Sequence, residues 1–126
     1  MVFDGNESLQ VAQFLGGEMY GPCTPESVQR AAISRAYFAA FVHALYYEVD
    51  NGRFQRSPID ERGKDHGRLR KHFKDQNKHK IASELKELHN WRKTCDYDFF
   101  IDPSMLLSAA LENSLRNAKN IIDSLI

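Results

Sequence analysis

The sequence has few of the features that mark secreted or membrane proteins. Its 126 residues include only two cysteines, Cys23 and Cys95, too few for the disulfide framework of a small secreted domain. No run approaches the roughly 20 consecutive apolar residues of a membrane span, and residues 1–4 lack the basic start of a signal peptide. We therefore expect a soluble protein of a reducing compartment, located in the cytoplasm.

The sequence also lacks internal repeats, low-complexity tracts and the alternation of apolar and polar residues that is typical of strands. Apolar residues recur at helical spacing instead, and a hydrophobic fraction of 42% is enough for one core without disulfides. We predict an all-α fold, an antiparallel bundle of four to five helices. Residues 1–126 would form one domain, with residues 1–20 as an N-terminal helix and linker and residues 24–126 as the bundle core.

The first two helices are predicted from their end signals. A helix over about residues 6–15 would turn Val11, Ala12 and Leu15 inward, stop at Gly16-Gly17 and lead into a short linker. Thr24 is suited to cap the second helix, and Pro25 would take its first position. This helix would run to about residue 50 and is apolar nearly all round between residues 31 and 47, which predicts that it is central and covered on most sides.

Three further helices are predicted in the second half of the chain. The third, over about residues 60–75, is weakly amphipathic and contains two glycines. The fourth would cover about residues 78–95 and be capped by Asn77. Asp102 followed by Pro103 repeats the cap-and-proline start, so we expect the last helix to begin there and to run to the C-terminus.

Charge is unevenly distributed along the chain although the formal net charge is zero. Residues 53–93 hold 13 Lys or Arg against 6 Asp or Glu, and both flanks are acidic. Such a surplus indicates either an anionic partner on one face or a helix face that is only solvated.

Two arginines lie within apolar helical patterns. Arg92 falls in line with Leu88 and Cys95, and Arg35 lies on the apolar second helix. A planar guanidinium in such a place pairs either with phosphate or with a carboxylate. For Arg92 the internal alternative is Asp96 or Asp98, and for Arg35 it is Asp96. If the two helices face each other, both arginines would line one cleft.

The five histidines do not have the spacing of a metal site, so we expect no metal. His66 shares a face with Leu69 and Phe73 and is either a hydrogen-bonded core residue or part of a site. The sequence contains no glycine loop for phosphates, no nucleophile elbow and no cofactor fingerprint. An enzyme with this sequence would work without a cofactor.

Three short motifs occur in order along the chain: residues 32–41 (AISRAYFAAF), residues 65–67 (DHG) and residues 91–97 (WRKTCDY). Together they resemble the small stand-alone HEPN proteins (higher eukaryotes and prokaryotes nucleotide-binding). The corresponding motifs of that family read Ser-Arg-Ala-Tyr-Tyr-Ala-Ala-Phe, a Thr-His-Gly type segment, and Arg followed by Ala-Asp-Tyr. The resemblance covers roughly residues 25–125 and includes the order, spacing and helical context of the motifs.

The resemblance implies a helical bundle that forms a homodimer with a cleft at its two-fold axis. Many HEPN proteins are metal-independent endoribonucleases of toxin–antitoxin or antiviral defence systems, and some act beside a nucleotidyltransferase antitoxin. Their signature is an arginine, four to six intervening residues and a histidine. In this sequence Tyr97, Asp98 and Phe99 occupy the three positions at which that histidine would stand after Arg92.

We accordingly expect an RNA-directed protein whose catalytic centre, if it cleaves, contains Arg92, Tyr97 and Asp96. Arg35, His66 and Lys93 would bind phosphate. An unperturbed phenol such as Tyr97 ionises near pH 10 and is a poor base at neutral pH, so His66 or His89 would have to supply the missing proton transfer. The alternative from another class is a non-catalytic module that binds a nucleotidyltransferase or another protein, with the arginines in internal ion pairs. A third possibility is that Tyr97 is modified by such an enzyme.

Overall fold

A computed structural model describes residues 2–17 and 21–126 of the chain. Within this part of the chain the α-helices are α1 (Gly5–Leu15), α2 (Pro25–Asp50), α3 (Asp65–Asp75), α4 (His79–Tyr97) and α5 (Leu107–Ser124). Two short 3₁₀ turns, η1 (Ile59–Lys64) and η2 (Pro103–Met105), precede α3 and α5. The described residues contain no strand, so the predicted all-α fold is confirmed.

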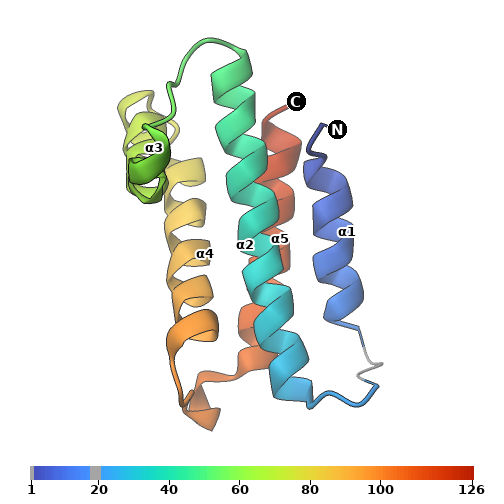
Figure 1. The fold of residues 1–126 in the computed structure, drawn as a ribbon. Coiled ribbons are helices and arrows are strands. Elements are labelled where there is room, and N and C mark those ends of the chain that lie inside the picture. Colours follow the sequence, from blue (N-terminus) through green and yellow to red (C-terminus); the bar gives the residue numbers. More distant parts are fainter. Residues whose placement is uncertain (1, 18–20) are drawn as a thin grey trace.

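The long helices form a bundle in which successive members run in opposite directions (Figure 1). In that view α2 lies in front, with α1 on one side, α4 on the other and α5 behind it. Helix α2 contacts α1, α4 and α5, and the short α3 packs on α4. The prediction that α2 is the central helix is therefore confirmed, although one of its faces stays uncovered.

The core gathers around α2 because small and large apolar residues alternate along it. Ala36, Ala40 and Ala44 are fully buried and allow the neighbouring helices to approach closely. Side chains from the other helices fill the remaining space, among them Leu9, Leu69, Phe73, Leu85, Leu88, Ala118, Ile121 and Ile122. Leu9 and Ala12 bring α1 into this same core cluster, so the N-terminal helix is packed into the bundle.

The predicted ends of α1 and α2 are confirmed. Thr24 accepts a hydrogen bond from the Ser27 backbone N–H, and Pro25 occupies the first turn of α2. Asn51 caps its C-terminus, and Gly52 follows with a φ of 71°, a conformation that glycine adopts without strain. Helix α1 ends at Leu15 with Gly16 as its C-cap, as expected. Part of the expected linker to Pro22 lies outside the described residues.

Three predictions about helix ends and faces are wrong. Asn77 does not cap α4, because it adopts a left-handed conformation (φ 62°) in the turn after α3. Asp102 caps only η2, and α5 begins at Leu107 after a second left-handed residue, Leu106. Val11 is exposed rather than inward, since Leu9 and Ala12 form the buried face of α1.

The expected third helix is divided into η1 and α3 at Asp65. The Asp65 carboxylate is fully buried and accepts hydrogen bonds from the Ser57 backbone N–H and from Arg68. Burial opposes its ionisation, but these hydrogen bonds outweigh that effect and hold the pKa of Asp65 below its usual range. This anchored carboxylate fixes the start of α3 and with it the position of the next residue, His66.

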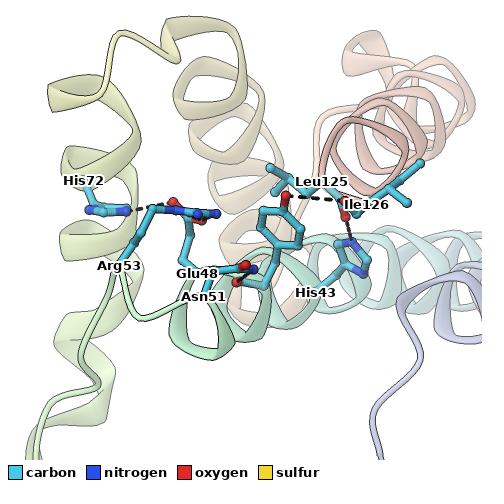
Figure 2. Close-up of polar contacts among 8 residues, drawn as sticks. His43, Glu48, Asn51, Arg53, His72, Leu125 and Ile126 are labelled. Atoms are coloured by element: carbon cyan, nitrogen blue, oxygen red, sulfur yellow. Dashed lines mark hydrogen bonds and ion pairs between the residues drawn. The ribbon is translucent and has the colours of Figure 1, made fainter.

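A second buried carboxylate, Glu48, joins the end of α2 to the rest of the bundle (Figure 2). Arg53, in the loop after α2, donates to Glu48 Oε2 from Nε and Nη2, at 2.9 and 2.6 Å. His72 of α3 places Nε2 2.9 Å from the other oxygen. Figure 2 also shows His43, whose Nε2–H donates to the Leu125 carbonyl at 2.6 Å and so ties α2 to the C-terminus.

Candidate functional site

The uncovered face of α2 forms the floor of an open groove of about 860 Å³, the α2 groove. Aromatic and aliphatic side chains of α2 make up much of its surface, and charged residues from α4 and from the segment before α3 stand on one side of it. The polar residues that line it are Ser34, Arg35, Tyr37, Tyr46, Arg56, His66, Arg92 and Asp96. Four of the six predicted site residues thus come together here: Arg35, His66, Arg92 and Asp96.

Arg92 is held in the groove by Asp96, one helical turn later on α4. Their ion pair joins Arg92 Nε to Asp96 Oδ2 at 2.9 Å, and the Ser34 hydroxyl donates to the same oxygen at 3.0 Å. The Arg92 guanidinium also lies 5.4 Å from the centre of the Tyr97 ring. Asp96 therefore orients Arg92 and connects α4 to α2, while the described residues provide no hydrogen bond to the Nη groups of Arg92.

Of the two internal partners expected for Arg92, the structure shows Asp96, but the pair is not buried among the apolar residues of α4. The side chains of Arg92 and Asp96 are 29% and 31% exposed, so water solvates both. A partly exposed pair of this kind contributes about 1 kcal/mol or less to stability. Removing Arg92 therefore does not cause the larger loss of stability that follows when a buried carboxylate is left without its partner.

Arg35 is exposed and lines the groove, so the internal alternative of a pair with Asp96 is wrong for this residue. Its guanidinium lies 5.4 Å from the centre of the Phe38 ring, one turn further along α2. Asp96 pairs with Arg92 rather than with Arg35. Arg35 thus stands at the rim of the α2 groove with its charge open to a ligand.

His66 lies at the inner wall of the groove within a cluster of aromatic rings. Its Nδ1 is 2.5 Å from the Tyr37 hydroxyl, and its ring stacks on Phe41 with centres 4.2 Å apart. The His89 ring lies 5.5 Å from His66 and 5.4 Å from Tyr37. His66 therefore has one nitrogen held by α2, and the hydrogen bond to Tyr37 sets the orientation of its ring.

The charges around this cluster favour neutral imidazoles. Burial, followed by the positive charges of Arg92 and Arg70, lowers the pKa of His66. Burial, then Arg70 and His66, lowers the pKa of His89 to about 4. Burial also raises the pKa of Tyr37, which keeps the phenol protonated. At neutral pH His66 is consequently uncharged and able to accept a proton.

These shifts predict that the fold loses stability in mild acid. Both histidines bind a proton less readily in the folded than in the unfolded chain, so the free energy of unfolding falls as pH drops from about 6.5 towards 4. Thermal melting between pH 7 and pH 4.5 measures this loss. The variant His89→Gln should show a shallower decline than the wild type, and Asn90→Ala, a change at the next position, should retain the wild-type slope. Equal slopes for the wild type and His89→Gln would contradict the shift.

Two predicted site residues lie outside the groove. Lys93 is exposed on α4 and does not line it. Tyr97 is 70% exposed and touches the site only through Arg92. Sequence reasoning missed Tyr37 and Arg56 as groove residues. Tyr37 falls within the stretch that the sequence describes only as apolar, although its place one turn before Phe41 puts both rings on the face that meets His66.

In the described part of the chain, no three His, Cys, Asp or Glu side chains come together as ligands that could hold a metal ion. Among the described helices, none is both long and apolar enough to cross a membrane. Cys23 is an exposed free thiol and Cys95 a buried one. Comparisons with protein-family models, with curated proteins and with solved structures found no match.

Proposed function

We propose that the protein is an RNA-directed protein of the HEPN type that binds and cleaves single-stranded RNA in the α2 groove. One observation carries this proposal: Arg92, Arg35 and a neutral His66 line a single groove with an aromatic floor. The composition of the groove matches what RNA presents. Guanidinium groups bind phosphate, and aromatic rings stack on unpaired bases.

In the proposed reaction Arg92 and Arg35 hold the phosphate, and His66 acts as the base. In the tautomer that serves this role, Nδ1–H donates to the Tyr37 oxygen and Nε2 carries the lone pair. Nε2 takes the proton of the RNA 2′-hydroxyl, and the 2′-oxygen forms a bond to the adjacent phosphorus. The bond from phosphorus to the 5′-oxygen breaks, that oxygen takes a proton from water, and the hydroxide formed takes the proton from the His66 imidazolium. The products are a 2′,3′-cyclic phosphate and a 5′-hydroxyl.

Arg92 supplies the charge that this reaction needs. Negative charge grows on the phosphoryl oxygens in the transition state, and a guanidinium oriented beforehand by Asp96 stabilises it without reorganisation. Tyr97 would pack beside the guanidinium rather than act as a base. The proposed roles of Asp96 and Tyr97 are therefore to position Arg92.

We also propose a homodimer, as the resemblance implies. Phe38 and Tyr46 are large side chains of α2 that stay exposed at the groove, and a second copy of the chain would cover part of this face. The length of RNA that the dimer encloses would then be set by the grooves of both copies together.

The test is incubation of the purified protein with mixed single-stranded RNA, with and without EDTA, beside Arg92→Ala. We expect cleavage that survives chelation, fragments ending in cyclic phosphate, and a loss of about 10²-fold or more in the variant. Because the Arg92–Asp96 pair is partly exposed, the variant should melt close to the wild type. Equal cleavage by both proteins would overturn the assignment of Arg92.

A second candidate is a non-catalytic module that binds a protein, such as a nucleotidyltransferase encoded nearby. The loop between α4 and α5 supports it, since Phe99, Phe100 and Leu106 are exposed there. Asp98 and Asp102 flank Phe99 and Phe100 in the sequence, so the partner would present a basic surface. Absence of cleavage in both proteins, together with loss of a copurifying partner in a Phe99→Ala/Phe100→Ala variant, would favour this reading.

A further inference from the structure

A second groove, of about 570 Å³, lies between α3 and α4 and is called here the α3–α4 groove. Cationic side chains dominate it, since four lysines or arginines line it against a single carboxylate, that of Asp75. The lining residues that carry charge or can titrate are Arg70, Lys71, Lys74, Asp75, His79 and Lys86.

The one carboxylate in this groove, that of Asp75, already forms an ion pair. Lys71 Nζ lies 2.8 Å from Asp75 Oδ2 in a pair between successive turns of α3. Arg70 Nη1 is buried and has no hydrogen-bond partner among the described residues. Lys74 and Lys86, from the two facing helices, likewise have no ion-pair partner within residues 2–17 and 21–126. Lys74 and Lys86 therefore line the groove from facing helices without a carboxylate partner in the described part of the chain, beside Arg70, an arrangement that an anion would stabilise.

Arg70 relates this groove to the α2 groove. It lines the α3–α4 groove and follows His66, which lines the α2 groove, by one turn of α3. The two grooves are thus neighbours across the contact between α3 and α4, and a flexible polyanion would be able to engage both.

We propose that the α3–α4 groove is a second phosphate site, which binds the backbone of the same RNA strand several nucleotides from the phosphate held by Arg92. This inference rests on the proposed function, because the same RNA strand must also bind in the α2 groove. It adds that the substrate is single-stranded RNA longer than a dinucleotide. Lys74 and Lys86 would contact phosphate from opposite helices, and Arg70 would donate from the groove wall. The site contributes affinity rather than cleavage, since none of its residues lines the α2 groove.

The test compares RNA binding by the full chain and by Lys74→Ala/Lys86→Ala, using fluorescent single strands of two and of about 12 nucleotides. For the longer strand we expect about tenfold weaker binding and a salt dependence reduced by about 1.4 logarithmic units per decade, from about 0.7 per lost phosphate contact. Binding of the dinucleotide should not change. The matched control is Arg116→Ala/Lys119→Ala, which removes the same charge from exposed positions on α5.

The outcomes separate this inference from the proposed function. If the longer strand binds but Lys74→Ala/Lys86→Ala behaves like the α5 control, the second site is wrong and the α2 groove proposal stands. If the dinucleotide loses affinity equally, the two lysines act through the overall field and the second site is again wrong. If neither strand binds to the wild type, the proposed function fails and this inference fails with it. Melting curves establish that both double variants are folded.

Discussion

Replacing His66 by glutamine should lower the rate of the proposed RNA cleavage by about 10²–10⁴-fold, the usual contribution of a general base. Glutamine keeps the approximate size of the side chain and retains polar atoms for the Tyr37 hydroxyl, but it accepts no proton at neutral pH. Under the proposed function, RNA affinity should change little, because Arg92 and Arg35, rather than the neutral imidazole, would bind the phosphate. The measurements are single-turnover cleavage and equilibrium binding of the same RNA.

His89→Gln is the matched control, because His89 belongs to the same aromatic cluster and its ring lies 5.5 Å from that of His66. It does not line the α2 groove, so its loss should leave most of the cleavage rate intact. Equal losses in the two variants would contradict the assignment of His66 and indicate that the cluster as a whole is required. A large loss in His89→Gln alone would make His89 the base.

The pH dependence gives an independent readout for His66. A base works only when unprotonated, so kcat/KM should rise with pH through the pKa of His66 and then level off. Burial and the nearby arginines place that pKa below the usual 6.5 of histidine, and the plateau should begin correspondingly early. A variant that is merely misfolded would lose rate at every pH and would retain this profile.

The sequence predicts the helices well where periodicity and capping agree. The start of α2 follows from Thr24 and Pro25, because the hydroxyl cap and the missing N–H act over one turn of chain. The start of α5 does not follow from Asp102 and Pro103, although the local signal is the same. There Asp102 caps only the 3₁₀ turn η2. Leu106 then adopts a left-handed conformation, which the local sequence does not predict.

The site could be predicted in part, for a related reason. Helical spacing places Arg92 and Asp96 one turn apart, and their ion pair follows from that alone. Exposure does not follow, because it depends on which faces of α2 the neighbouring helices leave open. The apolar pattern around Arg35 suggests burial, yet α1 and α4 cover the two sides of α2 and leave the face that carries Arg35 exposed. The contact of Tyr37 with His66 spans separate helices and needs the packed bundle.

Replacing Glu48 by alanine should produce the largest loss of stability, about 3 kcal/mol or more. Glu48 is fully buried, and its two oxygens bind Arg53 and His72, which come from the loop after α2 and from α3 (Figure 2). The variant would leave the partly buried His72 without its acceptor and would create a cavity in the core. Chemical denaturation measures the effect, and a single domain of this size commonly has only about 5–15 kcal/mol in total.

Glu48→Gln separates the charge of this residue from its volume. The amide fills the same space, but its NH₂ group cannot accept from Arg53 or His72, so one of them loses its partner. We expect a loss nearly as large as that of Glu48→Ala if the charge matters most, and a much smaller loss if the cavity does. Glu112→Ala, which removes an exposed carboxylate of α5, is the control and should leave stability almost unchanged.

The pH dependence of these variants identifies the charged form of Glu48 as the stabilising one. Burial opposes ionisation, but hydrogen bonds from Arg53 and His72 prevail and hold the pKa of Glu48 below its usual 4.5. Its contribution is therefore complete above about pH 4.5 and is lost as pH falls further, through the lower folded pKa. The difference in stability between the wild type and Glu48→Gln should shrink in that range. A difference that stays constant down to pH 3 would mean that the carboxylate acts through its shape and not through its charge.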